Sequence, residues 1–269
     1  MKKNRLIPIL LLKNGWLVQS IGFKEYKNLG NPITAVKRLS EWGSDELIYL
    51  DITKDDSYDL KRDDQRYENK NNFLEIIKDV SKATFMPFTI GGKIKKLSDI
   101  EDRLKIGADK ISINSVIYEN VKFIYEASRE FGSQCIVASI DVKFIQNQYM
   151  CYYQGGNKKS NESLLKIIKK LEDSGVGEIL INSIDRDGSK KGYDINLLNL
   201  VSSSTSVPVI ACGGVGNWDH LHEGLVKTNV DAVAAANIFH FIDQSVYLSK
   251  KFLYDKKLNV RKPDLLEIN

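Results

Sequence analysis

Several aspartates stand where short apolar runs of this sequence end. Asp51 closes "YLDIT", Asp141 closes "SIDVK", and Asp185 and Asp187 lie in "SIDRDGSKKG". An aspartate at the carboxyl end of a buried strand points toward the ligand-binding face, where burial adjusts its pKa for proton transfer. We therefore expect Asp141 to be a catalytic acid or base, whereas Asp185, Arg186 and Asp187 can also simply pair within a loop.

Two glycine pairs follow apolar runs of the same kind. Gly91-Gly92 ends "FTIGG" and Gly213-Gly214 ends "IACGG". Glycine lets backbone N–H groups come close to an anion such as phosphate. Two such turns would suit a substrate with a phosphate at each end, and tight turns without a ligand are the alternative.

No nucleophile or metal site is visible in the sequence. It has no GxSxG and no HExxH, and its three cysteines lack metal-ligand spacing. Separate cysteines in apolar runs favour reduced thiols and a reducing compartment. We expect no metal and no cofactor, and we interpret His220 and His222 as surface or packing residues.

Short apolar runs alternate with helical patterns eight times along the 269 residues. The predicted strands are Leu6–Leu12, Glu46–Leu50, Phe85–Ile90, Lys110–Ile113, Gln134–Ile140, Glu178–Asn182, Val207–Ala211 and Ala232–Ala235. The predicted helices include Pro32–Trp42, Asn72–Lys82, Ser98–Lys105, Val121–Phe131, Ser160–Ser174 and Ile195–Ser203. Such alternation indicates a parallel sheet covered by helices, and eight units in about 250 residues favour a closed (β/α)₈ TIM barrel over an open sheet. We expect a single α/β barrel over residues 1–269.

The two halves of the sequence resemble each other. Gly92 and Gly214 are 122 positions apart in matching motifs, and Asn114 and Asn237 are 123 apart. "ILLLK" likewise matches "SIDVK", so Leu11 stands where the second half has Asp141. These offsets predict two fused half-barrels, about residues 1–130 and 131–250, with a short tail after them. Chance similarity among barrel strands is the alternative.

Two insertions lie where a barrel has its active-site face. Lys54–Asn72 is highly charged, and Phe144–Asn161 contains a glycine pair that predicts a hinged loop. Either is expected to be a lid or a plain solvated loop.

The charge composition limits the kinds of molecule that the chain is expected to bind. The net charge is +4, and the lysines are spread along the chain without the basic and aromatic stripe of a nucleic-acid binder. This balance suits a phosphorylated small molecule, or it reflects only a solvated surface. The apolar run near the N-terminus is too short for a signal peptide or a membrane span. We expect a cytoplasmic protein without nucleic-acid or membrane partners.

Taken in order, the motifs resemble the cyclase subunit of imidazole glycerol phosphate synthase, from histidine biosynthesis. The matching pieces cover nearly the whole chain up to about Phe241 and are "RLIP", "DELIYLDIT", "GADKISINS", "FGSQCIV", "IDVK", "GEILINSIDRDGSKKGYD", "VPVIACGGVGN" and "NIFHF". The resemblance implies a (β/α)₈ barrel in a heterodimer with a glutaminase. Ammonia from the glutaminase would cross the barrel and cyclise a phosphorylated ribosyl–ribulosyl aminoimidazole carboxamide.

The resemblance also implies roles for individual residues. Of the family's two catalytic aspartates, the second matches Asp141 and the first falls on Leu11. The family's triple glycine reads Gly91-Gly92-Lys93 here. The implied phosphate- and substrate-binding residues are Lys13, Asp51, Gly92, Asn114, Ser115, Asp187, Gly188, Gly214 and Asn237. The implied ammonia gate comprises Arg5, Glu46, Lys110 and Glu178, with Gln134 along the internal route. Charges that merely solubilise the bottom of the barrel are the alternative for the gate.

Four functions remain open from the sequence. Because Leu11 cannot transfer a proton while the gate residues are retained, we favour a variant that supplies ammonia to a sugar-amidating enzyme. Members of such a branch carry "LLLKNG" at the first strand. The alternatives are an authentic cyclase that works through Asp141 with water or Lys13, a phosphosugar isomerase of the same pathway, and a scaffold without turnover.

Overall fold

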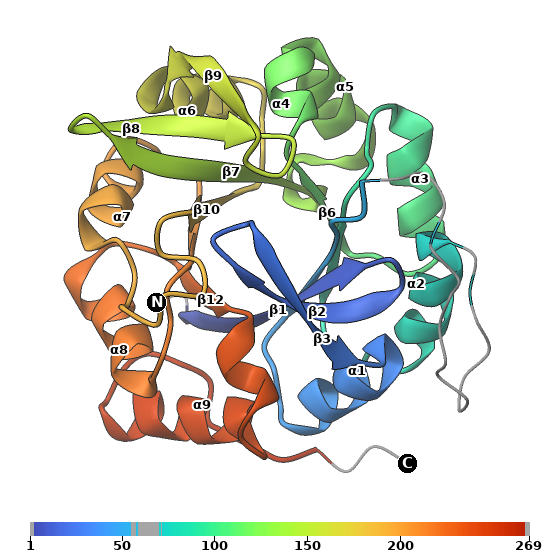
Figure 1. The fold of residues 1–269 in the computed structure, drawn as a ribbon, viewed down its shortest axis with the longest axis vertical. Coiled ribbons are helices and arrows are strands. Elements are labelled where there is room, and N and C mark those ends of the chain that lie inside the picture. Colours follow the sequence, from blue (N-terminus) through green and yellow to red (C-terminus); the bar gives the residue numbers. More distant parts are fainter. Residues whose placement is uncertain (1–2, 55–57, 59–69, 71, 267–269) are drawn as a thin grey trace.

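The chain folds into a closed barrel of parallel strands surrounded by helices (Figure 1). The structure is a computed structural model and describes residues 3–54, 58, 70 and 72–266. The barrel strands are β1 (Arg5–Lys13), β4 (Leu47–Asp51), β5 (Phe88–Gly91), β6 (Lys110–Ile113), β7 (Ile136–Ile145), β10 (Glu178–Ser183), β11 (Val209–Cys212) and β12 (Ala232–Ala235). Each pairs with the next in parallel, and β12 pairs with β1 to close the ring. The predicted (β/α)₈ fold is confirmed.

Helices cover the outside of this ring (Figure 1). They are α1 (Pro32–Glu41), α2 (Phe73–Lys82), α3 (Leu97–Lys105), α4 (Val116–Glu119), α5 (Val121–Phe131), α6 (Leu164–Asp173), α7 (Ile195–Ser202), α8 (Trp218–Lys227) and α9 (Ser245–Asp255). Two short 3₁₀ helices are η1 (Ser133–Cys135) and η2 (Asn237–His240). Many helices begin at a residue whose side chain accepts a backbone N–H of the first turn, as Asn72 and Asn217 do. Such N-caps satisfy donors that the helix itself leaves unpaired.

Alternation along the strands divides the core into two layers. Residues such as Ile7, Val137 and Leu180 fill the interior of the barrel in one cluster. The residues that alternate with these, for example Leu6 and Ile136, point outward and pack against the helices in a second and larger cluster. Which layer a residue joins therefore decides whether it can line an internal route.

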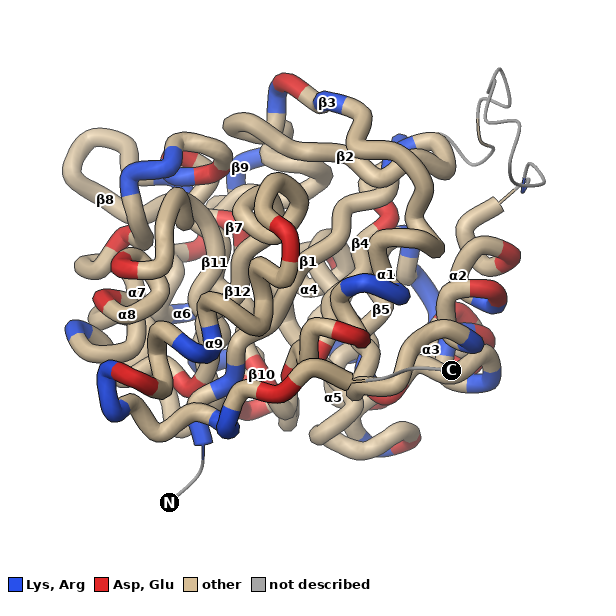
Figure 2. The backbone as a smooth tube through the Cα atoms, turned by 90° about the horizontal axis from the view of Figure 1, so that it is seen from below, with Lys and Arg blue, Asp and Glu red and all other residues tan. Residues whose placement is uncertain are grey.

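Two antiparallel hairpins extend the barrel at one end. β1 continues into β2 (Trp16–Ile21) and β3 (Glu25–Gly30), and β7 continues into β8 (Gln148–Tyr153) and β9 (Lys158–Ser163). Both hairpins lie at the end of the barrel opposite the N-terminus (Figure 2). The prediction of a loop over Phe144–Asn161 is therefore wrong, because most of these residues lie in strands. Most of the charged insertion Lys54–Asn72 lies outside the described residues.

The chain end packs back onto the barrel. Val260 pairs with Asn4 and is buried, so the predicted surface tail joins the core at this point. No helix in the described ranges has both the length and the apolar character needed to cross a membrane.

Candidate functional site

Asp141 lies inside the barrel in the middle of β7, where the parallel pairing with β10 ends and the antiparallel pairing with β8 begins. Its side chain alternates with those of the helix-facing Ile140 and Val142, and the residue is 6% exposed. Asn114 donates an amide hydrogen bond of 3.0 Å to one carboxylate oxygen, and Asn182 donates one of 3.2 Å to the other. Burial raises the pKa of Asp141 to about 6, although both amides lower it. A carboxyl group tuned in this way can exchange protons near neutral pH.

This raised pKa predicts a pH dependence of stability. Because the folded pKa is about 6 and the ordinary value is 3.8, the native chain holds a proton that the unfolded chain releases between these pH values. Stability contributed by this group therefore falls as the pH rises from about 4 to about 6, by on the order of 3 kcal/mol. Asp141→Asn should lose this dependence, measured as urea unfolding free energy at pH 4 and 7. Equal pH dependence in both proteins would contradict the assignment.

Leu11 occupies the interior on the opposite half-barrel. It packs against the interior cluster together with Leu50, Cys212 and Ala236. This side of the mouth is therefore apolar where the matching position of the second half carries Asp141. The structure thus places a single carboxylate, rather than a pair, at these two repeat-related positions.

Lys13 on β1 and Lys143 on β7 stand at matching positions of the sequence repeat. The Lys13 ammonium lies 4.0 Å from the centre of the Tyr26 ring, and that of Lys143 lies 4.6 Å from the Tyr152 ring. Burial and the charges of Asp187 and Asp141 raise the pKa of Tyr26. Lys13 is thus held against the β2–β3 hairpin near the mouth.

Asp51 lies on the helix-facing side of β4 rather than in the interior. Ile48 and Leu50 belong to the interior cluster, so Asp51 shares the outer side with Tyr49. Its carboxylate is fully covered and accepts a 2.9 Å hydrogen bond from the Thr53 backbone. Burial raises the pKa of Asp51, and its hydrogen bonds with Thr53 lower it. In this position Asp51 supports the neighbouring turn and is not brought beside Asp141.

The Gly91–Gly92–Lys93 turn adjoins Asp51. The Lys93 ammonium is 3.9 Å from a carboxylate oxygen of Asp51, and Lys93 has a positive φ of 53°. A side chain on Gly92 would collide with the backbone oxygen of Asp51. Glycine is therefore required at position 92 for close packing of the two strand ends.

The loops after β10 and β12 contact the β2–β3 hairpin. Asp187 accepts a 2.7 Å hydrogen bond from the Ser20 hydroxyl, and the Asn237 amide donates one of 3.1 Å to the Ser20 carbonyl. A Cβ on Gly188 would lie 2.9 Å from the Ser20 oxygen. Burial raises the pKa of Asp187. Asp187, Gly188 and Asn237 thus lie around the same part of the hairpin, and their binding of a phosphate or substrate stays a prediction.

In the first half, Ser115 contacts the other hairpin. Its hydroxyl oxygen accepts a 3.2 Å hydrogen bond from the Gln154 backbone at the β8–β9 turn. Each hairpin thus contacts a loop that carries a predicted phosphate- or substrate-binding residue, Asp187 for one and Ser115 for the other.

Four charged side chains close a ring at the amino-terminal end of the interior. Arg5 lies 2.6 Å from Glu46 and 2.7 Å from Glu178, and Lys110 lies 3.0 Å and 2.9 Å from the same two carboxylates. The side chains are between 9% and 18% exposed. Burial lowers the pKa of Arg5, but the attraction of Glu178 and Glu46 and the hydrogen bonds with them together outweigh burial and raise it. The ring therefore forms a polar constriction below an apolar interior.

Gln134 is not brought into this interior. It is exposed in η1, where its side chain lies against Gly132. The resemblance alone had suggested an internal position.

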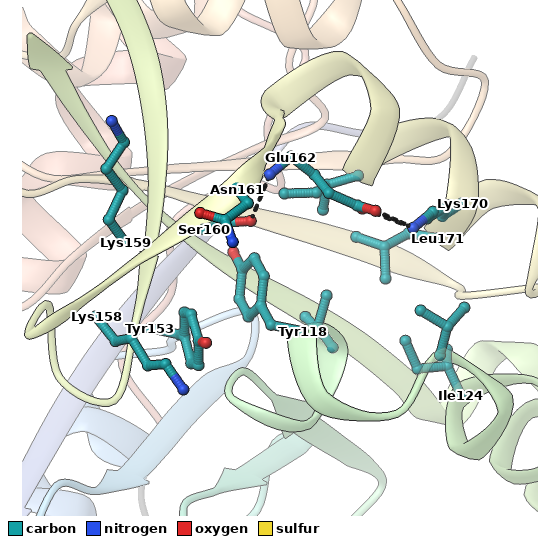
Figure 3. A pocket seen from close by; sticks show the side chains of 13 residues that line it. Tyr118, Ile124, Tyr153, Lys158, Lys159, Ser160, Asn161, Glu162, Lys170 and Leu171 are labelled. Carbon is teal, nitrogen blue, oxygen red and sulfur yellow. Dashed lines mark hydrogen bonds and ion pairs between the residues drawn. The ribbon is translucent and has the colours of Figure 1, made fainter.

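A cavity of about 310 Å³ lies outside the barrel, between β9 and helices α4 to α6 (Figure 3). Stacked Tyr118 and Tyr153 and the Lys158 side chain line it, together with Lys170. None of the predicted site residues lines this cavity. It is therefore separate from the mouth.

Two polar residues near the mouth were missed in the sequence. Asn182 on β10 binds Asp141, and Arg103 on α3 donates a 2.7 Å hydrogen bond to the Gly92 carbonyl. Asn182 could have been found because it follows an apolar strand at the same edge as Asp141. Arg103 carried no such signal, since it sits among other charged residues of a predicted helix.

A closed parallel barrel with a buried carboxylate and glycine turns at its carboxyl-terminal face defines a (β/α)₈ protein with an enzyme-type mouth. Residues 5–244 match the family described as "Histidine biosynthesis protein". The chain is 40% identical over 262 residues to imidazole glycerol phosphate synthase subunit HisF of Hydrogenobaculum sp. (strain Y04AAS1). The matched residues make up 97% of this chain and all of that relative. The chain belongs to this histidine biosynthesis family and is a HisF-like member of it.

Proposed function

We propose that this chain is the ammonia-receiving synthase subunit of a glutamine amidotransferase complex, paired with a glutaminase in a heterodimer. The closed ring of Arg5, Glu46, Lys110 and Glu178 carries this proposal, because it constricts the end of the interior opposite Asp141. An apolar interior favours neutral ammonia over ammonium, since burying an unpaired charge is costly. Ammonia that passes the ring would emerge beside Asp141.

The acceptor distinguishes two forms of this function. We favour the first form because Leu11 stands where a proton-transfer group is expected. In this form the chain passes ammonia to an enzyme that amidates a surface sugar. In the second form, the chain itself makes imidazole glycerol phosphate and aminoimidazole carboxamide ribotide. The 40% identity to a HisF subunit supports this second form. Asp141 would then act as the acid or base, with the two glycine turns holding the phosphates.

We also propose that the chain arose from two fused half-barrels. The antiparallel strands that follow β1 and β7 support this, and Lys13 and Lys143, 130 positions apart, each lie over a tyrosine ring of these strands. The ring belongs to Tyr26 on β3 in the first half and to Tyr152 on β8 in the second. The half-barrel boundaries near residues 130 and 250 remain as predicted from the repeat.

The variant Lys110→Ala tests whether the charged ring and the barrel interior guide ammonia to the mouth. It leaves Glu46 and Glu178 without one of their two cations and opens the constriction, so ammonia should escape before it reaches the mouth. We expect the complex with a glutaminase to form several-fold less product per glutamine hydrolysed. The Leu11→Asp chain is the suitable background, because it carries both carboxylates and cyclisation then reports ammonia arrival.

Lys105→Ala is the matched control. Its partner Glu101 lies 2.6 Å away, but both side chains are more than half exposed on α3. This variant should keep the product-to-glutamine ratio of the parent. If Lys110→Ala also keeps that ratio, the ring does not guide ammonia and the proposed conduit is wrong.

A further inference from the structure

Arg103 is a buried cation that the proposed function does not yet use. It lies on α3, is 6% exposed, and packs 6.0 Å from the Phe73 ring. One terminal nitrogen donates a 2.6 Å hydrogen bond to the Asp99 carbonyl of the same helix, and the other donates a 2.7 Å bond to the Gly92 carbonyl. Arg103 therefore ties α3 to the first glycine turn.

The equivalent carbonyl in the second half is also held. Gly214 stands 122 positions after Gly92, and the two have φ values of 101° and 107°. The Gly214 carbonyl accepts a 2.8 Å hydrogen bond from the backbone N–H of Gly192. The position equivalent to Arg103 is Leu225, again 122 residues on, which packs partly buried against the core. Both turns thus fix the same carbonyl, although the donor is a side chain in one and backbone in the other.

Fixing this carbonyl also orients the following amide. A trans peptide is planar, so its C=O and N–H point in opposite directions. With the Gly92 carbonyl held on the helix side, the N–H of Lys93 is directed away from α3, and the N–H of Val215 is likewise directed away from Gly192. Backbone N–H groups aimed in this way are what an anion-binding turn presents to its ligand.

We propose that Arg103 is a positioning residue for the first anion-binding turn, acting through the Gly92 carbonyl to aim the Lys93 N–H at a phosphate of the substrate. This inference rests on the proposed function for its ligand, a small molecule phosphorylated at both ends. Burying a guanidinium is costly, as the lowered pKa of Arg103 reflects. Leucine packs at the repeat-related position, so packing alone does not require arginine.

Site-resolved phosphate binding tests the inference. The full-length, isotope-labelled chain is titrated with inorganic phosphate while the backbone amides of Lys93 and Val215 are followed by NMR. Arg103→Leu should weaken phosphate binding at the first turn about tenfold, the loss expected for one misaligned hydrogen bond, and leave the second turn unchanged. Arg103→Lys, which keeps a donor, should lose less. A changed carbonyl carbon shift of Gly92 in Arg103→Leu without phosphate would support the same conclusion.

The outcomes separate the inference from the proposed function. Equal affinity at the first turn in wild type and Arg103→Leu would overturn the positioning role and leave the proposed function intact. Weakening at both turns alike would show a general loss of structure and would also overturn it. If the wild-type chain binds phosphate at neither turn, the phosphorylated substrate of the proposed function is wrong, and the role of Arg103 fails with it.

Discussion

Lys250→Met should lower the free energy of unfolding by about 3–5 kcal/mol, because it breaks a buried ion pair from one side. Lys250 on α9 lies 2.9 Å from Asp45, and their side chains are only 4% and 2% exposed. Lys250 also donates a 2.7 Å hydrogen bond to the Gly43 carbonyl. Methionine keeps most of the volume, so the loss reflects a buried carboxylate left, among the described residues, with only the largely exposed Arg261 as a cation, 3.9 Å away, rather than a cavity. Urea unfolding at neutral pH measures it.

The neighbouring lysine supplies the control. Lys251 lies at the same 2.9 Å from Asp255, but their side chains are 51% and 59% exposed. Lys251→Met should leave stability nearly unchanged, since water screens an exposed pair. The double variant Lys250→Met with Asp45→Asn should recover much of the loss, because an amide oxygen can still accept the 2.9 Å hydrogen bond from the Leu6 N–H. Equal losses for Lys250→Met and Lys251→Met would show that burial does not govern these pairs.

Leu11→Asp should raise ammonium-dependent cyclisation by about 10²–10⁴-fold, the usual contribution of one general acid or base. Leu11 and Asp141 occupy matching interior positions, and the new carboxylate would face the mouth from the opposite half-barrel. The assay follows the ribulosyl aminoimidazole carboxamide with excess ammonium at alkaline pH. The substitution also buries a carboxylate among Leu50, Cys212 and Ala236, so we expect it to cost stability.

Leu11→Asn is the matched control for this gain. It has nearly the shape of aspartate but transfers no proton, so turnover should stay at the wild-type level. A gain in Leu11→Asn equal to that in Leu11→Asp would assign the effect to polarity of the mouth rather than to proton transfer.

The barrel could be predicted from the sequence because its strands are short apolar runs with clear ends. Lys110–Ile113 and Ala232–Ala235 have the predicted bounds, because an aspartate directly precedes each of them. The first strand is followed by Asn114, and the second is followed closely by η2. The antiparallel pairing of β1 with β2 was missed although Asn14-Gly15 marks a two-residue turn between them, with φ values of 50° and 75°. The β7–β8 turn gave a weaker signal, because Gln146 and Asn147 adopt positive φ without glycine.

The site was less predictable than the barrel. Asp141 follows from its place at a strand end, but the same reasoning placed Asp51 in the mouth. Every residue before Asp51 on β4 is apolar, so alternation in the sequence cannot tell the interior from the helix-facing side. Arg103 shows a different limit, because its contact with Gly92 joins residues of a helix and a turn that no local pattern links.

Ammonium-dependent turnover by the unaltered chain tests the central claim most directly, namely that this barrel receives ammonia at a mouth with one proton-transfer group. The purified wild-type chain is given the ribulosyl aminoimidazole carboxamide and excess ammonium, and formation of imidazole glycerol phosphate is measured. We predict no turnover above background, which would place the acceptor on another enzyme. Robust wild-type turnover would contradict the ammonia-delivery form and establish the chain as a cyclase that works without the first aspartate.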